Sequence, residues 1–118
     1  MTIHLNLPYL NYILDVISDI EGSLRGVSED KFLKNKDIKE ANLRRLIIIG
    51  KAVNDLPTEI KEKYKEVSWN KISDISKEAD KAYFGVSNII IWNLLKNNLP
   101  TFKQQILKIR EELKKVYP

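Results

Sequence analysis

The densest group of side chains that could perform acid–base chemistry lies between residues 69 and 86. Its charged members are Lys71, Asp74, Lys77, Glu78, Asp80 and Lys81. If this segment is helical, residues three or four positions apart share one face, and Lys77 can form an ordinary ion pair with Asp80. Such pairs are a common arrangement on exposed helices and need no catalytic role. The segment therefore favours a charged, solvated helix face over a site for proton transfer.

Well-known catalytic and metal-binding motifs are absent from the sequence. It contains no Walker loop, no Rossmann glycine pattern, no G-x-S-x-G motif and no paired-histidine zinc motif. Without cysteine and with a single histidine, His4, it cannot form a thiolate site or the usual multi-histidine metal site. We therefore expect no metal ion and no cofactor, so any catalysis must come from side chains alone.

The composition is that of one folded domain with a highly charged surface. Of the 118 residues, 43% are hydrophobic and 31% are charged, which is an ordinary globular balance and enough for a single helical core. We expect one domain over residues 1–118. The net charge of +4 permits weak attraction to phosphates. Acids alternate with the basic residues, however, so charge alone does not predict a nucleic-acid binder.

No segment has the features of a secretion signal or a membrane span. The first residues lack a basic start followed by a long apolar stretch. The longest strictly apolar runs, residues 46–49 and 89–92, are far too short to cross a bilayer. We therefore expect a cytoplasmic protein that does not contact membranes.

Apolar residues recur every three or four positions along most of the chain, which predicts amphipathic helices. The first stripe runs from Leu10 to Leu24, with start signals at Asn6 and Pro8 and a stop signal at Gly26. Further helices are expected over residues 28–33, 37–55 and 59–64. The next helix is expected to run from Trp69, capped by Ser68, to about Gly85, and another to begin at Ser87. In the last stretch of the chain, one apolar stripe is formed by Phe102, Ile106, Ile109 and Leu113.

Two features of these helices bear on the architecture. In the helix that follows Ser87, the residues expected to face the core are Ile90, Ile91, Leu94 and Leu95. Residues 97–101 contain a proline, which has no backbone N–H to donate, and so predict a kink or a break. The whole pattern predicts an all-α fold, an antiparallel up-and-down bundle of about five helices.

The apolar block Leu46–Ile49 makes the second long helix hydrophobic on more than one face. Together with the apolar surface of the helix after Ser87, it predicts a homodimer whose core continues across a two-fold axis. The alternative is that these residues simply fill the core of the monomer.

Residues 69–86 resemble the signature segment of the HepT-like proteins, helical nucleases of the HEPN superfamily. Members typically read W-x-K-I, then an Arg, four residues, a His, one residue and Tyr-Phe-Gly-Val. The sequence keeps this frame at Trp69, Lys71, Ile72 and residues 83–86. Other matches in the family's order, between about Tyr9 and about Leu113, are Tyr12–Asp15, Phe32–Leu33, Arg45–Leu46, Ile48–Gly50, Leu56–Pro57, Tyr64, Trp92 and Leu99–Pro100.

The resemblance implies a dimer of five-helix bundles that places two R-x4-H segments beside a shared cleft. The activity of the family is cleavage of RNA without a metal ion. The Arg stabilises charge on the phosphate, and the His transfers protons around the attacking 2′-hydroxyl. Many members are toxins of a two-gene system. Their partner is a minimal nucleotidyltransferase, which attaches AMP to the Tyr two residues after the His.

The family's Arg, His and Tyr positions are occupied here by Ser76, Lys81 and Tyr83. Ser76 carries no charge for a phosphate. Lys81 can bind phosphate, but the ordinary lysine pKa of about 10.4 suits it poorly to proton transfer near neutral pH. Lys51 stands where the family often has Glu. Losing this Glu together with the Arg would fit the decay of a site in which the two residues form a pair, because neither is then needed without the other. Tyr83 is either a candidate for AMP modification or an ordinary packing residue.

Three functions remain open at this stage. The first is a HepT-like protein with a degenerate ribonuclease site, acting as a binding or regulatory partner of a nucleotidyltransferase. The second is an active ribonuclease toxin with an unrecognised site, such as Lys81 with Arg44 or Arg45 reaching across. The third is a structural helical dimer with no role in nucleic-acid chemistry.

Overall fold

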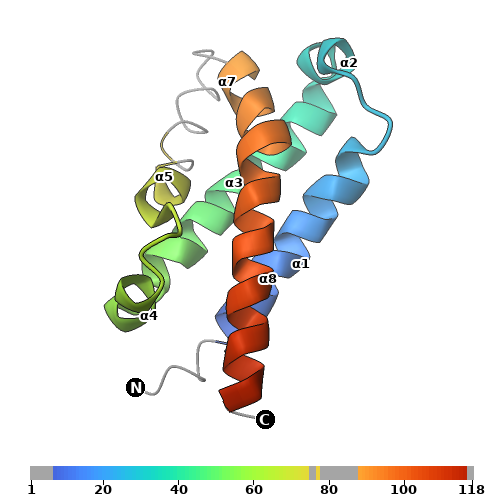
Figure 1. Cartoon of the computed structure of the whole chain (residues 1–118). Helices are drawn as coiled ribbons and strands as arrows, with labels where there is room; N and C mark the ends of the chain where they lie inside the picture. Colours follow the sequence, from blue (N-terminus) through green and yellow to red (C-terminus); the bar gives the residue numbers. More distant parts are fainter. Residues whose placement is uncertain (1–6, 75–76, 78–87, 117–118) are drawn as a thin grey trace.

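The body of the molecule consists of three long helices. They are α1 (Leu7–Leu24), α3 (Lys36–Asp55) and α8 (Leu99–Val116). α1 packs against both α3 and α8 and runs in the opposite direction to each of them (Figure 1). The computed structural model describes residues 7–74, 77 and 88–116, and every regular element among them is helical. The predicted antiparallel all-α bundle, of the HEPN type, is confirmed.

Local signals in the sequence fix most helix ends. Gly26 adopts a positive φ of 73°, which a residue with a side chain rarely adopts, and the chain turns there after α1. Ser28 begins α2 (Glu29–Lys34) by accepting a hydrogen bond from the Lys31 N–H at 3.1 Å. Asn35 does the same for α3, accepting from the Ile38 N–H at 3.0 Å.

Two short helices, α4 (Thr58–Lys63) and α5 (Trp69–Ser73), connect α3 to the second half of the chain. Ser68 is the N-cap residue of α5, as predicted, but its side chain accepts no hydrogen bond from the first turn of the helix. α5 also ends at Ser73, with Asp74 as its C-cap, instead of running to Gly85. Most of the remainder of that predicted helix, and the predicted cap at Ser87, lie outside the described residues.

The predicted break at residues 97–101 is not observed, and the helix is instead locally irregular just before Pro100, where it forms a π turn. α7 (Asn88–Asn93), the π-helical turn η2 (Leu94–Asn98) and α8 form one uninterrupted helix (Figure 1). In the π turn the Leu99 N–H donates to the Leu94 carbonyl, one residue further back than in an α-helix. Pro100 cannot donate to the carbonyl four residues earlier, and the wider turn accommodates this missing bond.

The core lies where α1, α3 and α8 meet, and it is almost entirely aliphatic and aromatic. The predicted stripe of Phe102, Ile106, Ile109 and Leu113 is buried as expected. The prediction that Ile90 faces the core is wrong, because 45% of its surface is exposed. The buried face of that helix follows Ile91 and Leu95, so Ile90 lies on the adjoining face, about 100° away.

Candidate functional site

Ser76, Lys81 and Tyr83, the residues predicted to stand at the three key positions of the family motif, lie outside the described residues, and so does His4. What the structure does describe is how the elements on either side of the motif are held. α5 precedes it in the sequence and α7 follows it.

Trp69 fixes the element before the motif. Its indole N–H donates to the Tyr64 carbonyl at 2.9 Å, and its ring lies edge-on to Phe102 with centroids 6.1 Å apart. Buried indole N–H groups need such a partner, because an unpaired one costs about 1–3 kcal/mol. Trp69 therefore joins α5 to both the preceding loop and α8.

Trp92 fixes the element after the motif in a similar way. Its ring packs on Phe32 of α2, with centroids 5.1 Å apart and an interplanar angle of 40°. The Lys96 ammonium lies 5.0 Å from the centroid of the same ring, within cation–π range. Each flank of the motif is thus anchored by a tryptophan that packs against another part of the bundle.

The charged residues of the motif segment are described only in part. Lys77 pairs with Asp74 at 3.8 Å, three residues earlier, and both side chains are well exposed. The pairing of Lys77 with Asp80 stays a prediction, since Asp80 lies outside the described residues. An exposed pair of this kind contributes little to stability, so these two residues form a solvated helix-type contact and no acid–base pair.

A buried asparagine holds one of the arginines that could serve an alternative site. Asn42 is fully buried and donates to Ser23 Oγ at 3.1 Å and to the Ile38 carbonyl at 2.9 Å. Its Oδ1 accepts a hydrogen bond from Arg45 Nη1 at 3.2 Å. Arg45 is half-buried and oriented by this network, whereas Arg44 is exposed. Of the two arginines, only Arg45 is held in place for a phosphate.

Lys51, predicted to stand where the family often has Glu, is exposed on α3 directly after the buried Gly50. Among the described residues it forms no ion pair. No acidic side chain in the described part of the chain therefore pairs with Lys51.

Tyr64 has a shifted pKa among the described residues. Burial raises the pKa of Tyr64 to about 12, and a hydrogen bond to Glu112 and the charges of Glu112 and Glu66 act in the same direction. A phenol that loses its proton so far above neutral pH cannot serve as a general base there. Tyr64 is therefore a packing residue that keeps its proton.

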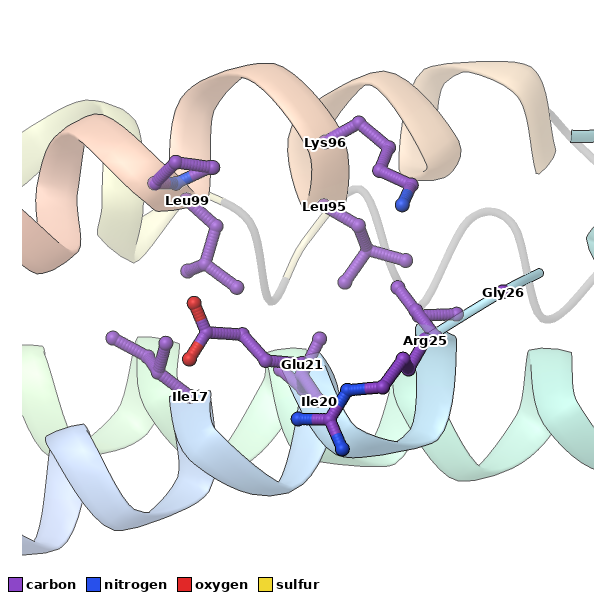
Figure 2. A pocket seen from close by; sticks show the side chains of 10 residues that line it. Ile17, Ile20, Glu21, Arg25, Gly26, Leu95, Lys96 and Leu99 are labelled. Carbon is purple, nitrogen blue, oxygen red and sulfur yellow. The ribbon is translucent and has the colours of Figure 1, made fainter. Parts of the chain in front are cut away.

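A hollow with a volume of about 530 Å³ lies between the end of α1 and the π turn. Figure 2 shows Leu95 and Leu99 pointing across it toward Ile17 and Ile20. Its polar rim consists of Glu21, Arg25 and Lys96, and Glu21 is already paired with Lys103 at 2.9 Å. The hollow is apolar at its base and positive at its edge. The sequence gave no signal for it, because its two walls are about 70 residues apart in the chain.

Metal and membrane sites were sought in the described residues as well. No group of three or more acidic or histidine side chains there could hold a metal ion. None of the helices in that part of the chain is long and apolar enough to cross a bilayer.

Comparison with known proteins identifies the family of this fold and motif frame. The family model described as "Ribonuclease HepT-like" matches residues 13–109. The chain belongs to the HepT-like ribonuclease family. The match runs from α1 through α8 and includes the elements that flank the motif. No solved structure gives a significant match to this chain.

Several relatives are similar over most of this HepT-like chain. One from Methanocaldococcus jannaschii, named "Gamma-glutamylcyclotransferase and putative RNase", is 39% identical over 91% of the chain, which spans only 48% of that relative. A "Putative RNase" from Caldanaerobacter subterraneus subsp. tengcongensis is 34% identical over 91% of the chain and 96% of its own length. A "Probable ribonuclease HepT" from Thermococcus cleftensis is 31% identical over 87% and 94%. The ribonuclease name is common to these relatives.

Proposed function

We propose that this chain is a HepT-like protein whose ribonuclease site has degenerated. It still binds RNA, and it acts in the cytoplasm as the binding or regulatory partner of a minimal nucleotidyltransferase, in a two-gene system of the toxin–antitoxin type. The observation that carries the proposal is a contrast within one segment. Trp69, Ile72 and residues 83–86 keep the family frame, while Ser76 and Lys81 replace the Arg and the His.

The chemistry of the described residues supports a degenerate site. Cleavage of RNA by a 2′-hydroxyl needs a group that exchanges protons near neutral pH and a cation on the phosphate. The only histidine of the chain, His4, is far from the motif in the sequence. The pKa of Tyr64 is shifted, but it is raised further above neutral pH, so this residue cannot replace a histidine. Nothing in the described part of the chain replaces the lost histidine.

Exposed apolar side chains support the proposed homodimer. Tyr9 and Tyr12 are 42% and 50% exposed at the start of α1, beside a hollow of about 260 Å³ that they form with Pro8. Ile89 and Ile90 are 55% and 45% exposed at the start of α7. Large apolar side chains at the surface favour contact with a second molecule when they gather in patches.

The degenerate site is tested by incubating the native chain with single-stranded RNA in the presence of EDTA. We expect no cleavage above the background of buffer alone, because Ser76 and Lys81 supply neither charge stabilisation nor proton transfer. Ribonuclease A on the same RNA shows that the substrate can be cut under these conditions. Cleavage by the native chain, retained after a second purification step, would refute the proposal.

The partnership is tested by co-expressing the chain with a minimal nucleotidyltransferase encoded by a neighbouring gene. We expect the two proteins to purify together and the intact mass of this chain to increase by one AMP group. The matched variant Tyr83→Phe keeps the aromatic ring and should show no increase. An unchanged mass of the native chain would remove Tyr83 as the modified residue, and failure to purify together would contradict the partnership.

A second candidate function is an active ribonuclease, which the names of the relatives favour. Arg45, oriented by the buried Asn42, is the described cation best placed to contribute to such a site. The cleavage assay distinguishes the two functions, and Arg45→Gln would abolish the activity if this second candidate were right.

A further inference from the structure

Two smaller hollows adjoin each other where α5 meets the π turn. The first, which we call the lysine groove, has a volume of about 410 Å³ and contains Lys61, Lys65 and Lys71 in its lining. The carboxylate in that lining is Glu62, so cations outnumber anions there. Among the described residues, Lys65 and Lys71 form no ion pair. Their ammonium groups are free to bind an anion from solution.

The second hollow, which we call the amide pocket, has a volume of about 200 Å³. Its base is formed by Ile72 and Phe102, both buried. The side chains around this base are almost all polar and uncharged, namely those of Ser68, Asn97, Asn98, Thr101 and Gln105. Ser68 and Lys71 line both hollows, so the groove and the pocket are neighbours.

The π turn gives the amide pocket its hydrogen-bonding groups. Asn97 and Asn98 are consecutive in the turn and both line the pocket, whereas Leu95 and Lys96 of the same turn line the larger hollow beside α1. Within the described part of the chain, no side-chain hydrogen bond is made by Asn97 or Asn98. π turns are frequent at functional sites, and this one leaves two amides available to a ligand.

The two hollows suit the two parts of a nucleotide. Lysine ammonium groups bind phosphates as point charges. Asparagine and glutamine amides both donate and accept hydrogen bonds, as the edges of a nucleobase do, and an apolar base accommodates the flat ring. The edge of a base is available in this way only when the base is unpaired.

We propose that the lysine groove and the amide pocket together bind single-stranded RNA, with phosphates on the lysines and one unpaired base in the pocket. This inference rests on the proposed role of the chain in RNA binding, and it adds where the RNA lies and which residues select the base. Lys71 is five residues before Ser76 in the sequence, which links this surface to the family motif. The pocket then gives the protein a base preference that does not depend on cleavage.

The proposal is tested by fluorescence anisotropy with short labelled RNA homopolymers of each base at several salt concentrations. The amide variant, Asn97→Ala with Asn98→Ala, should weaken the preferred homopolymer at least about five-fold and reduce the differences among the four. The lysine variant, Lys65→Ala with Lys71→Ala, should weaken all four alike. It should also reduce the dependence of log K on log salt by about 1.4, as expected for two lost phosphate contacts on a single strand.

Matched controls separate these effects from general ones. Asn93→Ala removes an exposed amide directly before the π turn, from a residue that does not line the amide pocket. Lys34→Ala with Lys36→Ala removes the same charge as the lysine variant, from α2 and α3. If RNA lies on the proposed surface, neither the Asn93→Ala control nor the double lysine control should change RNA binding by more than about two-fold. Gln105→Ala removes an amide from α8, outside the π turn, so a refolded turn cannot explain its effect. Circular dichroism should show the same helicity for every variant.

The results distinguish a failure of this inference from a failure of the proposed function on which it rests. If the native chain binds no RNA at all, the RNA-binding part of the proposed function fails, and this inference fails with it. If it binds RNA and the amide, lysine and Gln105→Ala variants bind as the native chain does, the placement of RNA on this surface is overturned and the proposed function stands. Equal weakening by Lys34→Ala with Lys36→Ala would also overturn the placement.

Discussion

Ser76→Arg together with Lys81→His is expected to raise metal-independent RNA cleavage at least about 100-fold above the native chain. The arginine would stabilise the charge that develops on the phosphate, and the histidine would exchange protons near neutral pH. The frame around both positions is already in place, because Trp69 and Trp92 anchor the flanking elements. The measurement is the rate of cleavage of a labelled single-stranded RNA in EDTA, at equal protein concentrations.

Single changes and one matched double variant serve as controls for this prediction. Groups that act as one catalytic unit give little activity alone, so Ser76→Arg and Lys81→His should each remain near the native background. Ser76→Arg with Lys81→Gln has the cation without the proton carrier and should also be inactive. A folded Ser76→Arg, Lys81→His protein without any gain would show that the loss of activity has another origin.

The exposed position of Lys51 allows the paired-site hypothesis to be examined in the same assay. Adding Lys51→Glu to the active double variant should increase cleavage further if the family acid and arginine work as a pair. Absence of any gain when Lys51→Glu is added to the Ser76→Arg, Lys81→His variant would count against decay of a paired site.

Phe32→Ala is expected to lower the free energy of unfolding by about 3–5 kcal/mol. The Phe32 ring is fully buried and packs on Trp92, so it joins α2 to α7 across the end of the bundle. Alanine would leave a cavity that the rigid helices can close only in part, and it would also remove the aromatic contact. Urea denaturation followed by circular dichroism gives this free energy from the midpoint and the slope.

Two comparisons make the stability prediction specific. Phe32→Leu keeps most of the buried volume and should cost much less. Lys31→Ala, at an exposed position next to Phe32 on α2, should change stability by no more than about 0.5 kcal/mol. All proteins must be compared at one concentration, because dimerisation would add to the apparent stability. A loss below about 1 kcal/mol in Phe32→Ala would contradict the role assigned to this contact.

Much of the fold could be predicted because its signals are local. Ser28 and Asn35 cap the helices that follow them, and Gly26 takes the positive φ that ends α1. The final apolar stripe is buried as its spacing indicates. Ser68 shows the limit of such signals, since a serine before a helix forms a capping hydrogen bond only if the backbone brings its oxygen to the first turn.

The sequence by itself determined that the chain is helical and that it has the HepT-like frame, and it predicts that Ser76 and Lys81 stand where that family has its Arg and His. Residue type and spacing along one chain are sufficient for these conclusions. Only the tertiary structure decided that Ile90 faces outward, that Pro100 follows a π turn, and that lysines from α4 and α5 adjoin amides from the π turn. Each of these depends on which elements pack together, and packing joins residues too distant in the chain for periodicity to relate them.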